Sequence, residues 1–173
     1  TTNGNENTAL GYQALLANVN GASSTAVGFQ AMSNFQNALA TTPYITYNTA
    51  IGYQALQGSA TPASNTGIHN TATGYQALKN STSARYNNAY GVQALFTNTS
   101  CQYNNATGYR ALYSNTSGYY NTALGASTLT NNTTGYGNTA IGYNALISNA
   151  TGNYNIALGF GANITEGLTN AIA

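Results

Sequence analysis

A motif built on Asn-Thr-Ala-Ile-Gly-Tyr-Gln-Ala-Leu recurs along the whole chain, and this repeat constrains the fold more than any other feature. Nine copies precede the beginning of a tenth, and their marker glycines are separated by 17, 24, 22 and then five times 17 residues. These glycines are Gly11, Gly28, Gly52, Gly74, Gly91, Gly108, Gly125, Gly142 and Gly159. A fixed period indicates one small supersecondary unit stacked on copies of itself. Because each unit contacts mainly its neighbours along one axis, a pocket enzyme is disfavoured.

The composition supports an ordered chain and restricts its partners. The 27 Asn and only 3% charged residues would suit a disordered polar tract, but the 15 Tyr and the aliphatic residues recur at regular positions. Three basic and two acidic residues give a net charge of +1. Phosphate binding depends on several Lys or Arg contacts, so we expect no nucleic-acid partner. No apolar run approaches the roughly 20 residues of a membrane helix, so we expect no membrane insertion.

Each copy of the motif indicates one coil of a parallel β-solenoid. Thr-Ala-Ile-Gly-Tyr alternates with period two, as a strand does. Ala precedes the glycine by two residues in every copy, and Leu or Met follows it by four in eight of nine, which predicts an interior of Ala, Gly and Leu. Asn, four before and seven after the glycine, suits corners because it tolerates the left-handed conformation. Stacked Asn side chains can also bond between coils.

We therefore predict an all-β chain, a parallel β-solenoid (β-roll) of about ten coils. Most coils have 17 residues, and each would hold two short strands and two turns. Residues 1–173 would form one repeat domain.

Two longer coils carry insertions at about 33–47 and 57–69, which contain Pro43 and Pro62. Loops on neighbouring coils often form a binding face, and tolerated loop drift is an equally good interpretation. Neither terminal coil shows a capping element, and open β edges pair with further β structure. We therefore expect the chain to continue beyond this sequence, or rods to join end to end.

The stretches 48–53 and 138–143 both read Asn-Thr-Ala-Ile-Gly-Tyr and resemble the Asn-Ser-Val-Ala-Ile-Gly repeat of trimeric autotransporter adhesin heads. The longer form, Asn-Thr-Ala-Leu-Gly-Tyr-Gln-Ala-Leu, is similar to repeats of some phage and giant-virus fibre proteins. The resemblance covers nearly the whole chain. It implies a left-handed parallel β-roll, three chains side by side, and attachment outside the cell. The chain departs from the adhesin family in coil length, because the adhesin repeat is shorter than 17 residues.

Two columns of aromatic residues are the candidate contact surface. One column follows the motif glycine directly, and the other precedes it by five residues. Stacked rings offer flat apolar area with a polar tip, suited to sugars or proteins, although packing of coil on coil or rod on rod is the more ordinary interpretation. With Tyr44 and Tyr47 of the first insertion, the candidates are Tyr12, Tyr44, Tyr47, Tyr53, Tyr75, His69, Tyr86, Tyr103, Tyr109, Tyr120, Tyr143 and Tyr154.

The residues that catalysis or metal binding needs are scarce. Glu6 and Glu166 lie at opposite ends of the chain, too far apart for paired catalytic carboxylates. With one His, one Cys and no Asp, neither a metal cluster nor a nucleophile–base pair can be assembled. We expect no enzyme, no metal and no cofactor. Cys101 occupies a position where other copies have small residues, which indicates a tight turn rather than a reactive thiol.

N-glycosylation sequons recur on many coils. The candidate acceptors are Asn80, Asn98, Asn115, Asn132 and Asn149. Glycans on every coil would collide at a spacing of about 4.8 Å, so we expect sparse occupancy if any.

Three functions fit these patterns. The leading hypothesis is a non-enzymatic structural segment of an extracellular fibre, on a microbial surface or a virion, self-associating as a homotrimer or end to end. The alternative is an adhesin or tail-fibre head that binds a cell-surface glycan or protein receptor through the Tyr columns and the insertions. An ice-binding solenoid ranks low, because its threonine column is interrupted by Asn88, Asn105 and Ile156. That column contains Thr8, Thr25, Thr49, Thr71, Thr122 and Thr139.

Overall fold

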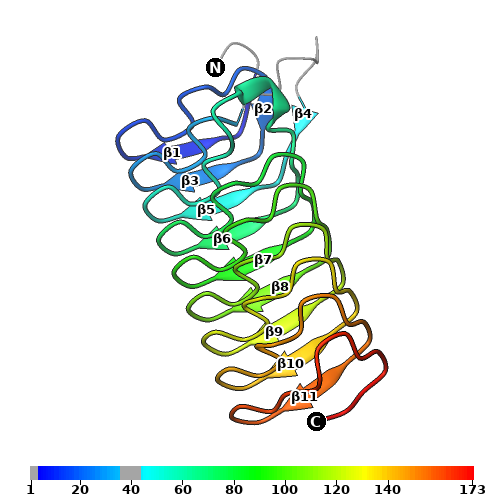
Figure 1. Ribbon diagram of the computed structural model, residues 1–173. Coiled ribbons are helices and arrows are strands. Elements are labelled where there is room, and N and C mark those ends of the chain that lie inside the picture. Colours follow the sequence, from blue (N-terminus) through cyan, green and yellow to red (C-terminus); the bar gives the residue numbers. More distant parts are fainter. Residues whose placement is uncertain (1–3, 36–43) are drawn as a thin grey trace.

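The computed structural model describes residues 4–35 and 44–173, which wind into a rod of stacked coils (Figure 1). The strands are β1 (Thr8–Leu10), β2 (Gly21–Ala22), β3 (Thr25–Val27), β4 (Tyr44–Ile45), β5 (Thr49–Ile51), β6 (Thr71–Thr73), β7 (Asn88–Tyr90), β8 (Asn105–Thr107), β9 (Thr122–Leu124), β10 (Thr139–Ile141) and β11 (Ile156–Leu158). One short 3-10 helix, η1 (Pro62–Ser64), lies in the second insertion.

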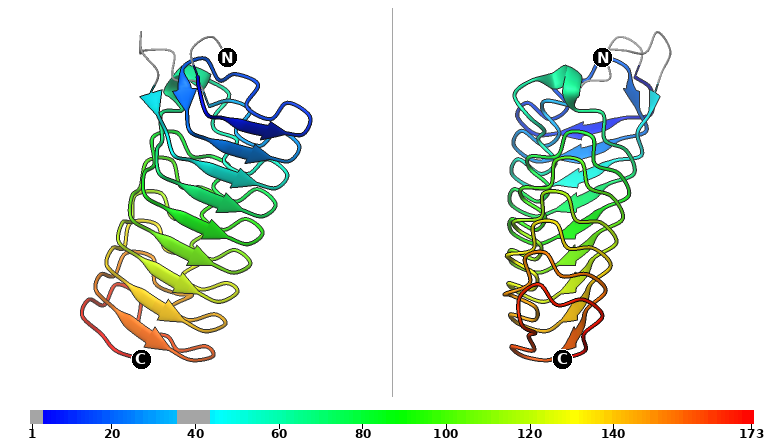
Figure 2. Two further views of the ribbon diagram at one scale, coloured as in Figure 1. Left: turned by 180° about the vertical axis from the view of Figure 1, so that it is seen from behind. Right: turned by 45° about the vertical axis from the view of Figure 1, so that its right-hand side comes forward.

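Nine of these strands form one parallel sheet in the order β1-β3-β5-β6-β7-β8-β9-β10-β11. Each strand pairs with the equivalent strand of the next coil, so that Ala106, for example, lies opposite Ala123. A further bridge joins Ile156 to Ile172, where the tenth copy of the motif begins. Figure 2 shows the strands stacked along the rod. The parallel β-solenoid predicted from the repeat is confirmed.

The interior of the rod is a narrow apolar column. In the coils between the two ends, the central Ala of the strands and the Ala three residues after the motif glycine are buried, as Ala106 and Ala111 illustrate. Small Ala side chains let the walls of the coil approach, and Leu fills the remaining width. The large apolar side chains with almost no exposure are Met32, Leu56, Leu78, Leu95, Leu112, Leu129 and Leu146. The predicted interior of Ala and Leu is thus confirmed.

The segment directly after the motif glycine is a series of turns. The predicted second strand of each coil is found only in part: β2 pairs with β4, and isolated bridges join Ile68 to Arg85 and Arg85 to Gln102. In one central coil, Gln93 and Leu95 have φ of 56° and 53° on either side of buried Ala94. Left-handed residues two positions apart prevent a pleated strand, and the Ala94 N–H donates to the Gly91 carbonyl (3.4 Å). This backbone costs about 1–3 kcal/mol per non-glycine residue. Coil-to-coil bonds, such as Leu95 N–H to the Ala111 carbonyl (3.0 Å), offset that cost.

The motif glycine stands at the corner between strand and turns, and its predicted place in the interior is wrong. Gly91 is half-buried and has a φ of 131°, which L side chains rarely adopt. A Cβ at this position would lie 2.5 Å from the Gly108 carbonyl oxygen of the next coil. Both the backbone conformation and the close approach of adjacent coils therefore require glycine.

The Asn four residues before the glycine is interior, and its predicted place at a left-handed corner is wrong. Asn104 Nδ2 donates to Asn87 Oδ1 (3.2 Å) in the preceding coil and to the Gly118 carbonyl (3.0 Å) in the following one. Asn104 Oδ1 accepts from the backbone N–H (3.0 Å) and Nδ2 (3.3 Å) of Asn121. We call Asn48, Asn70, Asn87, Asn104, Asn121, Asn138 and Asn155 the inner asparagine column. Its coil-to-coil bonds confirm the predicted Asn stacking.

A second buried column, the turn asparagine column, lies seven residues after the glycine. Asn132 Nδ2 donates to Asn115 Oδ1 of the preceding coil (2.9 Å) and to the Gly135 carbonyl of its own turn (2.9 Å). The members are Asn18, Asn98, Asn115, Asn132 and Asn149. Ser81 takes this place in the coil before Asn98. Ser81 Oγ and Asn98 Nδ2 are buried without hydrogen-bond partners among the described residues.

The structure describes only the two ends of the first insertion. Residues 36–43 of this insertion lie outside the described residues. Just after them, Tyr44 of β4 pairs with Gly21 of β2 in a separate two-stranded sheet. Tyr44 therefore belongs to a strand pair instead of a free loop.

The second insertion is anchored by a buried amide. Asn65 Nδ2 donates to the Asn34 carbonyl (2.8 Å) and to the Ser59 carbonyl (2.9 Å). The helix η1 of this insertion lies at the N-terminal end of the rod (Figures 1 and 2). This anchoring makes the insertion part of the folded rod.

Replacing Ser81 by Asn should repair the turn asparagine column. The new amide can bond to Asn98 as neighbouring members bond to each other, so we expect stabilisation by about 1–2 kcal/mol. Urea unfolding measures it, with Ser83→Asn in the same turn as control. Stability equal to or below that of the unmodified chain would show that the gap has another origin.

Candidate functional site

The aromatic residues that follow the motif glycine form an exposed, stacked edge of the rod. This post-glycine column contains Tyr12, Phe29, Tyr53, Tyr75, Tyr109, Tyr143 and Phe160. The rings of Tyr53 and Tyr75 are representative, with centroids 5.2 Å apart and planes at 10°. Val92 and Ala126 interrupt the column on either side of Tyr109, so the stacked rings are those from Tyr12 to Tyr75 and the pair Tyr143–Phe160. The coil spacing matches the ring-stacking distance, so these residues stabilise neighbouring coils while keeping one edge in solvent.

A second stacked edge precedes the strands by two residues. This pre-strand column contains Tyr47, His69, Tyr86, Tyr103 and Tyr120. The rings of Tyr86 and Tyr103 lie 5.0 Å apart and are nearly parallel at 3°. His69 is half-buried and stacks on Tyr86 at 4.8 Å. The predicted equivalence of His69 with the Tyr residues is confirmed by its place in the stack.

Two of the predicted contact residues lie outside these columns. Tyr44 is half-buried in β4. Tyr154 follows Gly137, which breaks the pre-strand column, and its ring meets Tyr136 edge-on at 5.0 Å and 78°. A side-chain hydrogen bond with Tyr136 raises the pKa of Tyr154. The continuous pre-strand surface therefore ends at Tyr120.

Arg110 supports the exposed rings in the middle of the rod. Its guanidinium carbon lies 5.3 Å from the Tyr109 ring centroid and 5.0 Å from the Tyr113 ring centroid. Its Nε donates to Gln93 Oε1 (3.0 Å), so a side chain of the preceding coil holds the guanidinium in place. Cation–π contacts of this exposed kind contribute about 0.5–1 kcal/mol.

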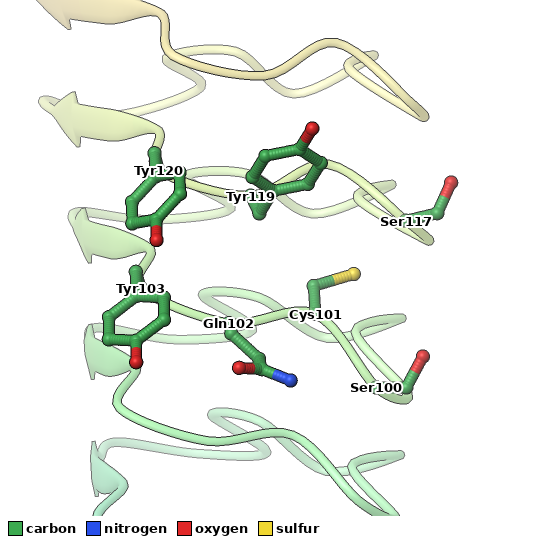
Figure 3. A pocket seen from close by; sticks show the side chains of 7 residues that line it. All are labelled: Ser100, Cys101, Gln102, Tyr103, Ser117, Tyr119 and Tyr120. Carbon is green, nitrogen blue, oxygen red and sulfur yellow. The ribbon is translucent and has the colours of Figure 1, made fainter.

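A groove of about 310 Å³ opens between two central coils at the pre-strand column (Figure 3). Its lining residues are Ser100, Cys101, Gln102, Tyr103, Ser117, Tyr119 and Tyr120. Only Tyr103 and Tyr120 were among the predicted contact residues. Tyr119 was missed because its position, six before the glycine, is not aromatic in the earlier coils. The adjacent pair Tyr119–Tyr120, unique in the chain, is the signal that could have revealed it.

Cys101 lies at the base of this groove and is chemically protected. Its Sγ donates to the Thr116 carbonyl (2.8 Å), and its side chain is buried. Burial raises the pKa of the thiol from 9.0 to about 11. The thiol is therefore protonated at neutral pH and is a poor nucleophile. This agrees with the prediction of a small residue in a tight turn.

The fold conflicts with glycosylation at four of the five candidate sequons. Asn98, Asn115, Asn132 and Asn149 have no exposed surface, because they form the turn asparagine column. A glycan on their Nδ2 atoms would break the coil and has no space inside it. Asn80 alone is half-buried, and it stays a candidate acceptor.

The outer face of the nine-stranded sheet is uncharged, and aliphatic side chains dominate toward both of its ends, with Thr73, Tyr90 and Thr107 between them. The third residue of each strand points away from the buried Ala, and Leu124 and Ile141 are 46% and 40% exposed. This outer strand column contains Leu10, Val27, Ile51, Thr73, Tyr90, Thr107, Leu124, Ile141 and Leu158. Beside it runs the threonine column of the first strand residues, which is also uncharged. Contiguous exposed apolar surface of this kind marks interaction sites.

Ionisable side chains form no reactive cluster in the described ranges. No group of three His, Cys, Asp or Glu residues there could hold a metal ion. Glu6 Oε2 accepts a hydrogen bond from Ser23 Oγ (2.9 Å) at the N-terminal end, far along the sequence from Glu166. No helix in the same ranges is long and apolar enough to cross a membrane.

Comparison with known proteins gave no match to a protein-family model, to a curated protein or to a solved structure. The likeness to adhesin and fibre repeats therefore rests on the motif sequences themselves.

The raised pKa of Cys101 predicts slow alkylation. Raising the pKa from 9.0 to about 11 lowers the thiolate fraction at neutral pH about a hundredfold. We expect iodoacetamide to modify the folded protein far more slowly than the urea-unfolded protein, as followed by mass spectrometry. Because the folded pKa is the higher one, the thiol's contribution to stability is complete below pH 9.0 and is lost as pH rises through about 11. Equal alkylation rates in the two states would contradict the buried position.

Proposed function

We propose that this chain is a non-enzymatic structural segment of an extracellular fibre and that it self-associates side by side. The observation that carries the proposal is the outer strand column. It runs along all nine strands of the sheet and is backed by an interior bonded from coil to coil. The length of such a rod grows with the number of its coils. This architecture suits a spacer better than it suits an enzyme with a pocket.

The chemistry of this face favours a second copy of the same chain as its partner. The face has no charged side chain, so it offers nothing to steer a charged partner. Its side chains repeat with the coil spacing, so a second rod laid alongside meets the same pattern in register. Burying Leu124, Ile141 and their equivalents would contribute about 25 cal/mol per Å² of apolar area. Three rods around a common axis, as the resemblance implies, would cover the face on every copy.

Location outside the cell and a role in attachment follow from the resemblance to adhesin and fibre repeats. The near absence of charged and catalytic side chains is in keeping with both. Receptor or glycan binding is the second candidate function, and the groove at Tyr119 favours it. Ice binding ranks lowest, because Asn88 and Asn105 interrupt the threonine column in the middle of the sheet.

Charge on the outer strand column should prevent association. In the variant with Leu124→Lys and Ile141→Lys, two ammonium groups would need to be desolvated between rods. We expect the unmodified chain to sediment as an oligomer, a trimer if the resemblance holds, and the variant to sediment as a folded monomer. Analytical ultracentrifugation and circular dichroism measure this.

The matched control changes the turns of the same two coils. Asn131→Lys and Ser148→Lys add the same charge at exposed positions outside the strands and should leave association intact. A monomeric unmodified chain at every concentration, or equal effects of the two double variants, would overturn the proposed face.

A further inference from the structure

The groove of Figure 3 lies where a further row of rings, beside the pre-strand column, begins on the rod. Six residues before the motif glycine, successive coils carry Ile68, Arg85, Gln102, Tyr119 and Tyr136. Tyr119 and Tyr136 stack at 4.8 Å and 8°. In the preceding coil the equivalent residue is Gln102, which has no ring. Tyr119 therefore forms a ledge above the Gln102 side chain in the view of Figure 3.

The ledge meets an aromatic wall at a steep angle. Tyr103 and Tyr120 form the wall, with ring centroids 4.9 Å apart and planes at 13°. Tyr119 is inclined at 73° to Tyr120, with centroids 5.4 Å apart. A ligand in this corner would contact aromatic surface from two directions.

Polar groups without protein partners surround the corner. Within residues 4–35 and 44–173, the side-chain amide of Gln102 and the side-chain hydroxyls of Ser100 and Ser117 form no hydrogen bond. All three lie along the groove, with the two serines at the end away from the wall (Figure 3). The Cys101 thiol is already engaged with the Thr116 carbonyl. No charged side chain lines the groove.

We propose that this groove binds a neutral saccharide. A sugar ring has an apolar C–H face, which suits the Tyr119 ledge or the Tyr103–Tyr120 wall, and a rim of hydroxyls, which suits Gln102, Ser100 and Ser117. The volume of about 310 Å³ is at the lower end of the range of about 300–1,000 Å³ for ligand pockets, as one or two sugar rings require.

Other ligand classes fit less well. A nucleotide needs cations for its phosphates, and the lining has none. A peptide that adds as a further β-strand would need a free strand edge. Here the Tyr103 and Tyr120 N–H groups already donate to the carbonyls of Arg85 and Gln102 (3.2 and 3.3 Å). The groove residues also lie outside the strands of the outer strand column, so binding can be tested independently of association.

The experiment titrates the intact chain with cellobiose, lactose and N,N′-diacetylchitobiose, followed by saturation-transfer NMR and calorimetry. An uncharged Gly/Ser/Pro peptide is the comparison ligand. Tyr119→Ala removes the ledge. Gln102→Tyr extends the Tyr119–Tyr136 row downward and fills the groove. Tyr75→Ala removes a stacked ring of similar exposure, 46% against 41% for Tyr119, from the post-glycine column.

We expect at least one of these sugars to bind with a dissociation constant in the millimolar range. Tyr119→Ala should weaken binding at least about tenfold, and Tyr75→Ala should leave it within about twofold. Gln102→Tyr should abolish binding without lowering the melting temperature, which separates loss of the site from loss of the fold. The proposal is overturned if none of the sugars binds, if only the peptide binds, if Tyr119→Ala and Tyr75→Ala weaken binding equally, or if Gln102→Tyr still binds.

Discussion

A buried side-chain amide that bonds to the coils on both sides is the interaction on which the rest of the rod depends. The sheet covers only three residues of each coil, so backbone pairing between strands leaves most of the coil to other contacts. An interior of Ala with one Leu per coil buries too little apolar area for a single coil to offset its ordering entropy. The inner asparagine column supplies the missing link, because Asn104 uses both donors and accepts twice inside a dry interior.

Because buried residues hold the coils together, the exposed residues of the rod can vary and serve a function. The interior positions are nearly invariant from coil to coil, whereas the exposed positions change without disturbing the coil. At one position the residue passes from Arg85 to Gln102 to Tyr119, and the groove lies where Gln102 is followed by Tyr119. The strand face, by contrast, stays apolar or neutral along the whole sheet, as a surface for regular side-by-side packing requires. The proposed association and the proposed sugar site therefore depend on different exposed positions of one scaffold.

Interior Ala and Leu positions could be predicted from the sequence because burial demands uniformity in every coil. The turns were harder, since Gln93 and Leu95 adopt left-handed backbone that local propensity assigns to Gly or Asn, and only stacking of identical coils makes it tolerable. The burial of Asn98 could not be predicted from its sequon either. A sequon is a pattern of three neighbouring residues, whereas the exposure of the Asn side chain depends on how the coils stack. Tyr119 was not predicted because the repeat was interpreted from the residues that successive coils share. The groove depends instead on a position at which neighbouring coils differ.

The adjacent residues Asn104 and Asn105 allow the most direct test of the central claim. Asn104 belongs to the inner asparagine column, whereas the side chain of Asn105 is exposed in β8. Asn104→Ala would leave the buried backbone N–H of Asn121 without its acceptor and would remove the side-chain bonds that Asn104 makes to the coils on both sides. Unfolding in urea should therefore show a loss of about 2–4 kcal/mol. Asn105→Ala should change stability by less than about 0.5 kcal/mol. Equal and small losses for the two variants would contradict the claim that the buried amide column holds the coils together.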